Sequence, residues 1–185
     1  MEQNNFETLF NAALKDIKTD LHDEFDKNFQ RKAFFDKSWQ EAKHDFRKGS
    51  LLVRNGNLRR GLQSRVEGDK IIFTNTQIYA DIHNKGGTIT VTPKRKKFFW
   101  AMYYAAMGKM TTKKDGTRGN SKGNINLNAD AAYWKSLALM KVGARITIPQ
   151  RQFVGWHPVV KEIVKGHFDK HFTVIAEEVK KMLKA

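Results

Sequence analysis

The feature that most constrains the fold is a regular spacing of apolar residues near the start of the chain. From Phe6 to Phe29 these residues recur every three or four positions, which aligns them on one face of a long amphipathic helix. The members are Phe6, Leu9, Phe10, Ala13, Ile17, Leu21, Phe25 and Phe29. A second apolar stripe follows Pro158, which suits the first turn of a helix, and extends to about Leu183. We therefore expect a long helix at each end. The N-terminal stripe packs on its own domain or, alternatively, docks onto a neighbouring subunit.

The segments between these helices predict short strands. Residues 70–74, 88–92 and 144–148 are rich in β-branched side chains, which favour strands. Residues 78–87 predict a short helix closed by glycine, and the aromatic-rich segment 33–47 predicts a short helix or a turn followed by one. We expect an α+β fold: a small, mostly antiparallel sheet flanked by long N- and C-terminal helices, with a basic helical and loop insertion.

The length predicts one domain, because 185 residues suffice for a single compact core. We divide this domain, 1–185, into four segments: an N-terminal helical region at 1–47, a core at 48–93, a basic insertion at 94–143, and a strand plus C-terminal helix at 144–185. No cysteine occurs, which excludes disulfides and cysteine-ligated zinc. The sequence has neither a secretory leader nor a run of about 20 apolar residues, so we expect synthesis in the cytoplasm and no membrane contact.

Positive charge is the strongest compositional signal. The 34 Lys and Arg against 19 Asp and Glu give a formal charge of +15, which favours a polyanion or an acidic protein surface as partner. Residues 94–122 hold nine basic side chains and one acid, Asp115. These nine are our candidates for contact with DNA or with another subunit: Lys94, Arg95, Lys96, Lys97, Lys109, Lys113, Lys114, Arg118 and Lys122. The glycine-rich loop 108–124 is alternatively a mobile, solvated connection.

No arrangement of residues indicates an enzyme, a cofactor or a metal centre. His83 is the best catalytic candidate by appearance, but a hydrogen bond that stabilises a turn is the favoured interpretation. His167 and His171 have a metal-binding spacing on a helix, yet only the distant His157 or Asp169 offers a third ligand, so we interpret them as surface histidines. The serines occupy no nucleophile elbow. We therefore expect a protein without catalytic, cofactor-binding or metal-binding residues.

Two separated segments carry a resemblance to a known family. Residues 56–59 (GNLR), 79–83 (YADIH) and Gly86-Gly87 form the first segment, and residues 148–155 (IPQRQFVG) form the second. In this order they resemble the phage virion morphogenesis family, which includes protein G of phage Mu and the tail completion proteins of related phages. The residues that carry the resemblance are Gly56, Leu58, Arg59, Tyr79, Ala80, His83, Gly86, Gly87, Arg151, Phe153 and Gly155.

The resemblance implies a structural protein of the virion rather than an enzyme. Members of such a family act in tail completion or head–tail joining at the neck, which implies a homo-oligomeric ring, of six or twelve copies, around the DNA passage. It also implies other neck or tail proteins as partners and synthesis in the cytoplasm of a bacterial host. The basic side chains add the hypothesis that the protein contacts packaged DNA nonspecifically or faces an acidic ring next to it. The alternative from another class is a sequence-nonspecific nucleic-acid-binding protein. A metal-dependent nuclease that uses His167 or His171 ranks last.

Overall fold

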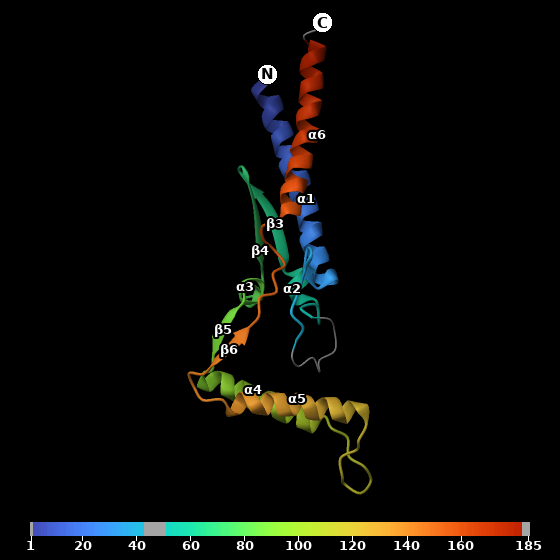
Figure 1. Ribbon diagram of the computed structural model, residues 1–185, viewed down its shortest axis with the longest axis vertical. Coiled ribbons are helices and arrows are strands. Elements are labelled where there is room, and N and C mark those ends of the chain that lie inside the picture. Colours follow the sequence, from blue (N-terminus) through green and yellow to red (C-terminus); the bar gives the residue numbers. More distant parts are fainter. Residues whose placement is uncertain (1, 43–50, 183–185) are drawn as a thin grey trace. The chain divides into compact units, whose positions relative to one another are not determined.

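The computed structural model describes residues 2–42 and 51–182, and it confirms the α+β class. Six helices and short antiparallel strand pairs make up the fold in this part of the chain (Figure 1). The chain divides into two compact units. The first consists of residues 1–40, 51–85 and 150–185, and the second of residues 41–50 and 86–149. The second unit includes the whole of the segment 94–143 that the sequence sets apart.

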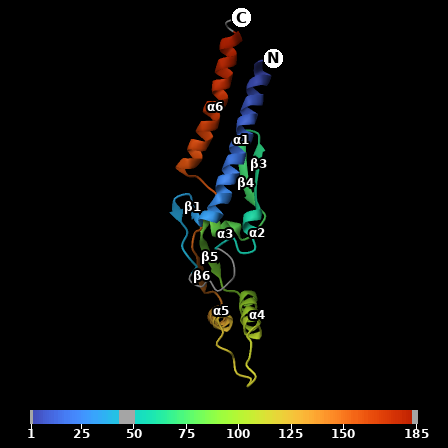
Figure 2. The same ribbon diagram turned by 90° about the vertical axis from the view of Figure 1, so that its right-hand side faces the viewer.

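Two long helices form one side of the first unit, as the two apolar stripes predict. Helix α1 (Glu2–Arg31) and helix α6 (Pro158–Met182) run antiparallel and side by side in both views (Figures 1 and 2). Aromatic rings join them near their free ends, with ring centroids 5.8 Å apart for Phe10 and Phe168 and 6.3 Å apart for Phe6 and Phe172. The N-terminal stripe thus packs within its own unit.

Two strand pairs and two short helices complete the first unit. The strands are β1 (Ala33–Phe34), β2 (Lys37–Ser38), β3 (Leu62–Glu67) and β4 (Lys70–Asn75), and the helices are α2 (Asn57–Arg60) and α3 (Ala80–Lys85). The pairs β1–β2 and β3–β4 are antiparallel. Of the two alternatives for 33–47, a helix that begins at residue 33 is wrong, because residues 33–38 form the β1–β2 hairpin with its turn. No helix follows over residues 39–42, and residues 43–50 lie outside the described part.

The core of the first unit has two clusters of buried side chains. One lies against the middle of α1 and consists of Ile17, Leu21, Phe25, Phe34 and Leu62. The other lies at the C-terminal end of α1 and consists of Phe29, Trp39, Leu58, Ala80 and Phe153. Because both clusters take residues from α1 and from later segments, burial of the α1 stripe holds the unit together.

The second unit is a helical hairpin on a strand pair. Strand β5 (Gly87–Thr90) pairs antiparallel with β6 (Arg145–Ile148), and helices α4 (Pro93–Gly108) and α5 (Lys122–Leu139) pack against each other. Their shared core contains Phe99, Trp134 and Ala138. The strands expected at 88–92 and 144–148 therefore pair with each other. In the described residues the strands form three separate two-stranded ladders instead of joining in one sheet.

Candidate functional site

The two segments that carry the family resemblance meet in the first unit, in what we call the motif junction (residues 56–59, 79–85 and 151–155). Asn84, at the end of α3, makes the central contact. Its side-chain Oδ1 accepts hydrogen bonds from the backbone N–H groups of Phe153 (2.8 Å) and Val154 (3.0 Å), and its Nδ2 donates to the Val154 carbonyl (3.0 Å). These partners lie 69 and 70 residues away along the chain. Asn84 is absent from the motif residues that the sequence predicts.

Further bonds and packing close the junction. The backbone N–H of Arg151 donates to the His83 carbonyl at 2.8 Å. Phe153 is buried in the same cluster as Leu58 and Ala80, and its ring centroid lies 5.0 Å from that of Phe29. Two motif segments far apart in sequence therefore form one packed structure.

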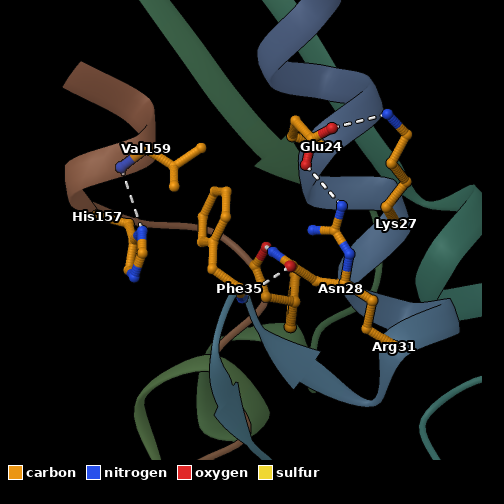
Figure 3. A network of polar contacts seen from close by, with 8 residues as sticks. Glu24, Lys27, Asn28, Arg31, Phe35, His157 and Val159 are labelled. Atoms are coloured by element: carbon orange, nitrogen blue, oxygen red, sulfur yellow. Dashed lines mark hydrogen bonds and ion pairs between the residues drawn. The ribbon is translucent and has the colours of Figure 1, made fainter. Parts of the chain in front are cut away.

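Helix α1 holds the junction from the other side. Asn28 is fully buried. Its Nδ2 donates to the Phe153 carbonyl at 3.1 Å. Its Oδ1 accepts from the backbone N–H of Phe35 at 3.0 Å, the bond drawn in Figure 3. The guanidinium of Arg59 donates two hydrogen bonds to the carboxylate of Asp26, which ties α2 to α1 and raises the pKa of Arg59. Asn28 is buried, and Arg59 and Asp26 are bonded to each other, so these side chains serve to hold the scaffold together.

The glycines of the motif fit backbone that other residues rarely adopt. Gly56, before α2, has φ of 79°, and Gly86, after α3, has φ of 73°. Gly155 has φ of 155°, and a Cβ there would lie 2.1 Å from Nε2 of Gln152. Gly87 begins β5 and so belongs to the second unit, and Tyr79 is 40% exposed. The motif residues are thus conformational and packing residues for the most part.

His83 contributes to the junction through its backbone. Its carbonyl accepts the hydrogen bond from Arg151 N–H, whereas its buried Nδ1 has no hydrogen-bond partner among the described residues. Burial, with the positive charges of Arg151 and Arg54, lowers the pKa of His83. Burial also lowers the pKa of Arg151, whose Nε donates to the Gln40 carbonyl at 3.0 Å. The imidazole is therefore held in its neutral form within the scaffold.

The basic candidates all lie in the second unit, on what we call the basic hairpin (residues 93–139). Residues 86–149 contain twelve basic and two acidic side chains, an excess of ten out of the chain's fifteen positive charges. Lys96 is half-buried, and the other eight are exposed: Lys94, Arg95, Lys97, Lys109, Lys113, Lys114, Arg118 and Lys122. Four of the nine lie in the first turns of α4, where the helix dipole disfavours cations unless an anion is close. The arrangement suits an anionic partner.

The loop between α4 and α5 is held by a residue that the sequence analysis missed. Asn124 is buried, its Oδ1 accepts from the backbone N–H of Thr111 at 3.0 Å, and its Nδ2 donates to the carbonyls of Thr111 and Gly119 at 2.8 and 2.7 Å. Thr112 pairs with Arg118 in an antiparallel bridge. The loop is thus a small hairpin that presents Lys113 and Lys114 at its tip.

The side chains with catalytic or metal-binding chemistry lie on the long helices. Ser64 Oγ is 3.0 Å from His22 Nδ1, but Ser64 is in mid-strand rather than on an elbow. Two acids of α1 face the histidines of α6: His171 Nε2 is 3.0 Å from Asp16 Oδ2, and His167 Nε2 is 2.7 Å from Asp20 Oδ2.

These contacts correct the expected third ligand. His157 instead lies 3.0 Å from Asp36, with its Nδ1 accepting from Val159 N–H (Figure 3), and Asp169 pairs with Lys165. The carboxylate that groups with both histidines is that of Asp16: its ligand atom and those of His167 and His171 lie within 4.8 Å of one another.

Within residues 2–42 and 51–182, no helix has both the length and the apolar character that crossing a membrane requires. No family model, curated protein or solved structure matches the chain.

Proposed function

We propose that the protein is a non-enzymatic structural component of a phage particle. Its particular role, in this proposal, is tail completion or head–tail joining at the neck. The observation that carries the proposal is the motif junction, in which the two segments of the family resemblance are bonded to each other through Asn84, Arg151 and Phe153. Contact between the two segments supports the proposal, because segments that define one family motif are expected to form one structure.

The placement of charge supports a role next to DNA or to an acidic protein ring. Basic side chains on the exposed hairpin offer phosphate contacts without reading sequence, as a protein along a DNA passage requires. Repeated copies that make heterologous contacts close into a ring when the rotation between copies closes. We propose a ring of six or twelve copies whose basic hairpins face the passage or a neighbouring ring.

The test is removal of the coding sequence from the phage genome that carries it. The expected result is filled heads and separate tails in electron micrographs, with joining restored by the wild-type protein supplied in trans. Complementation by the charge-reversed variant Lys113→Glu/Lys114→Glu is expected to fail. The matched control is Lys161→Glu/Lys170→Glu, an equal charge change on the exposed face of α6, which is expected to complement. Joined, infectious particles formed without the protein would refute the proposal.

The concentration of charge in residues 86–149 also favours a second candidate, a free protein that binds nucleic acid without sequence preference. This candidate predicts tight, strongly salt-dependent binding of the purified protein to random duplex DNA. The particle role predicts weak binding in solution and co-purification with virions.

A further inference from the structure

The side chains where α1 and α6 lie side by side form a set that fits a metal ion. Asp16, His167 and His171 each offer one ligand atom, and these three atoms lie within 4.8 Å of one another. Among the described residues this is the one group of three or more acidic, histidine or cysteine side chains with that geometry. From these residues we infer that the protein binds one divalent transition-metal ion, of which Zn²⁺ is the best fit.

The donor set has the chemistry that Zn²⁺ prefers. Two imidazoles four residues apart on a helix, joined by one carboxylate, are a recurrent Zn²⁺ set that leaves a fourth position for water. Ligand atoms around a tetrahedral zinc at about 2.1 Å are roughly 3.4 Å from one another. Closing from 4.8 Å to that separation requires movements of about 1 Å, which side-chain torsions supply. The harder ions Mg²⁺ and Ca²⁺ prefer all-oxygen sites and fit poorly.

Asp20 completes the arrangement by holding His167. A carboxylate only accepts hydrogen bonds, so the 2.7 Å contact with Asp20 places the proton of a neutral His167 on Nε2. The lone pair is then on Nδ1, a buried atom with no hydrogen-bond partner among the described residues. A histidine that donates one ring N–H to a carboxylate while its other nitrogen is free matches the usual support of a metal-bound histidine.

Access and charge both suit a cation. The side chains of His167 and His171 are 18% and 17% exposed, whereas that of Asp16 is 50% exposed, so an ion can approach the group from the side of Asp16. Two carboxylates face two imidazoles, and a divalent ion would balance the charge of the carboxylates. Because Asp16 and His171 are 155 residues apart, the ion would also close a very long loop and stabilise the pairing of α1 with α6.

The test is calorimetric titration of tag-free, chelator-treated full-length protein with ZnCl₂. We expect one Zn²⁺ per chain, with affinity reduced about 100-fold by Asp16→Asn or His171→Gln and roughly 10- to 100-fold by Asp20→Asn, the supporting carboxylate. The matched control is His157→Gln, which breaks a histidine–aspartate contact of the same kind just before α6, outside the three-ligand group, and should leave affinity unchanged. Absence of stoichiometric binding, or equal effects of His157→Gln and His171→Gln, would overturn the inference.

A second measurement uses the wild-type protein alone, so it remains informative even if a variant fails to fold. Long-range ¹H–¹⁵N spectra of the wild-type imidazoles, recorded while ZnCl₂ is added, should show shifts of the ring nitrogens of His167 and His171, with those of His22 and His157 unmoved. Excess MgCl₂ should not reverse these shifts. Zn²⁺ that perturbs all the histidines alike would mark nonspecific binding and refute the site.

Discussion

Substitution of Asn28 by alanine tests whether the buried amide, rather than apolar burial alone, fixes the motif junction to α1. The side chain is fully buried and makes two hydrogen bonds, one to the Phe153 carbonyl and one from the Phe35 N–H. Alanine leaves both backbone groups without these partners. An unsatisfied buried group costs about 1–3 kcal/mol. Since Phe35 is only half-buried and water reaches it in part, we expect a total loss of about 3 kcal/mol.

The assay is urea unfolding followed by the indole N–H resonance of Trp39. This group donates to the Gln152 carbonyl at 2.6 Å and therefore reports on the first unit. With a denaturant dependence of about 2 kcal/mol per molar urea, the loss lowers the midpoint by roughly 1.5 M. Gln30→Ala, an exposed change two residues away on α1, is the control and should stay within about 0.5 kcal/mol of the wild type. Equal midpoints for Asn28→Ala and Gln30→Ala would refute the reasoning, as would undiminished protection of the Phe35 amide from hydrogen exchange in Asn28→Ala.

Three further predictions concern other parts of the chain. Asn124→Ala should speed hydrogen exchange of the Thr111 amide at least tenfold, because its acceptor is lost, and an unchanged rate would contradict the role of Asn124. His83, whose pKa is lowered in the folded protein, takes up its proton more readily when unfolded, so stability should fall as the pH drops below about 6.5. Unfolding measured from pH 7 to 5.5 should show a shallower decline for His83→Gln. Gly155→Ala should lower the free energy of unfolding by about 1–3 kcal/mol, because alanine rarely adopts the backbone conformation of Gly155. Gly166→Ala, within α6 and with open space for a methyl group, should raise it by up to about 1 kcal/mol. Effects of the same sign would be inconsistent with the structure.

Periodicity predicts the long elements well because it records which face is buried. The stripes of α1 and α6 and the strands near 70–74, 88–92 and 144–148 all lie close to where the sequence places them. Strand β3 also alternates between more and less exposed residues, but its polar composition hides the signal. A helix or strand that is buried on one face has apolar residues at the period of that element, so the pattern within the segment itself reveals the element.

The hairpin at residues 33–38 could not be predicted in that way. Lys32 and Phe35 have φ of 54° and 53°, a conformation that such residues rarely adopt without outside support. Part of that support is the bond from the Phe35 N–H to Asn28, seven residues earlier. The aromatic composition favours burial without specifying a helix or a turn, and the contact that decides between them is tertiary.

The candidate sites also differ in how far the sequence predicts them. The sequence predicts the lysines of the basic hairpin, because charge is read directly from residue types. Asp16 and His171 are 155 residues apart and lie opposite each other only because of the register between α1 and α6. No local pattern in the sequence records that register. Asn84 and Asn124 resemble ordinary turn residues until their partners are known.

The motif junction and the basic hairpin belong to different compact units, so substitutions in each of them test different properties of the protein. Leu58, Ala80 and Phe153 are buried, so a substitution among them acts first on stability, and loss of function there says little about partners. Exposed lysines such as Lys113 and Lys114 belong to a different compact unit and take no part in the junction's bonds. Their replacement should therefore change contact with an anionic partner while the unfolding of the first unit stays as in the wild type. A variant series on the hairpin can thus measure function with stability held constant, which the motif residues themselves do not allow.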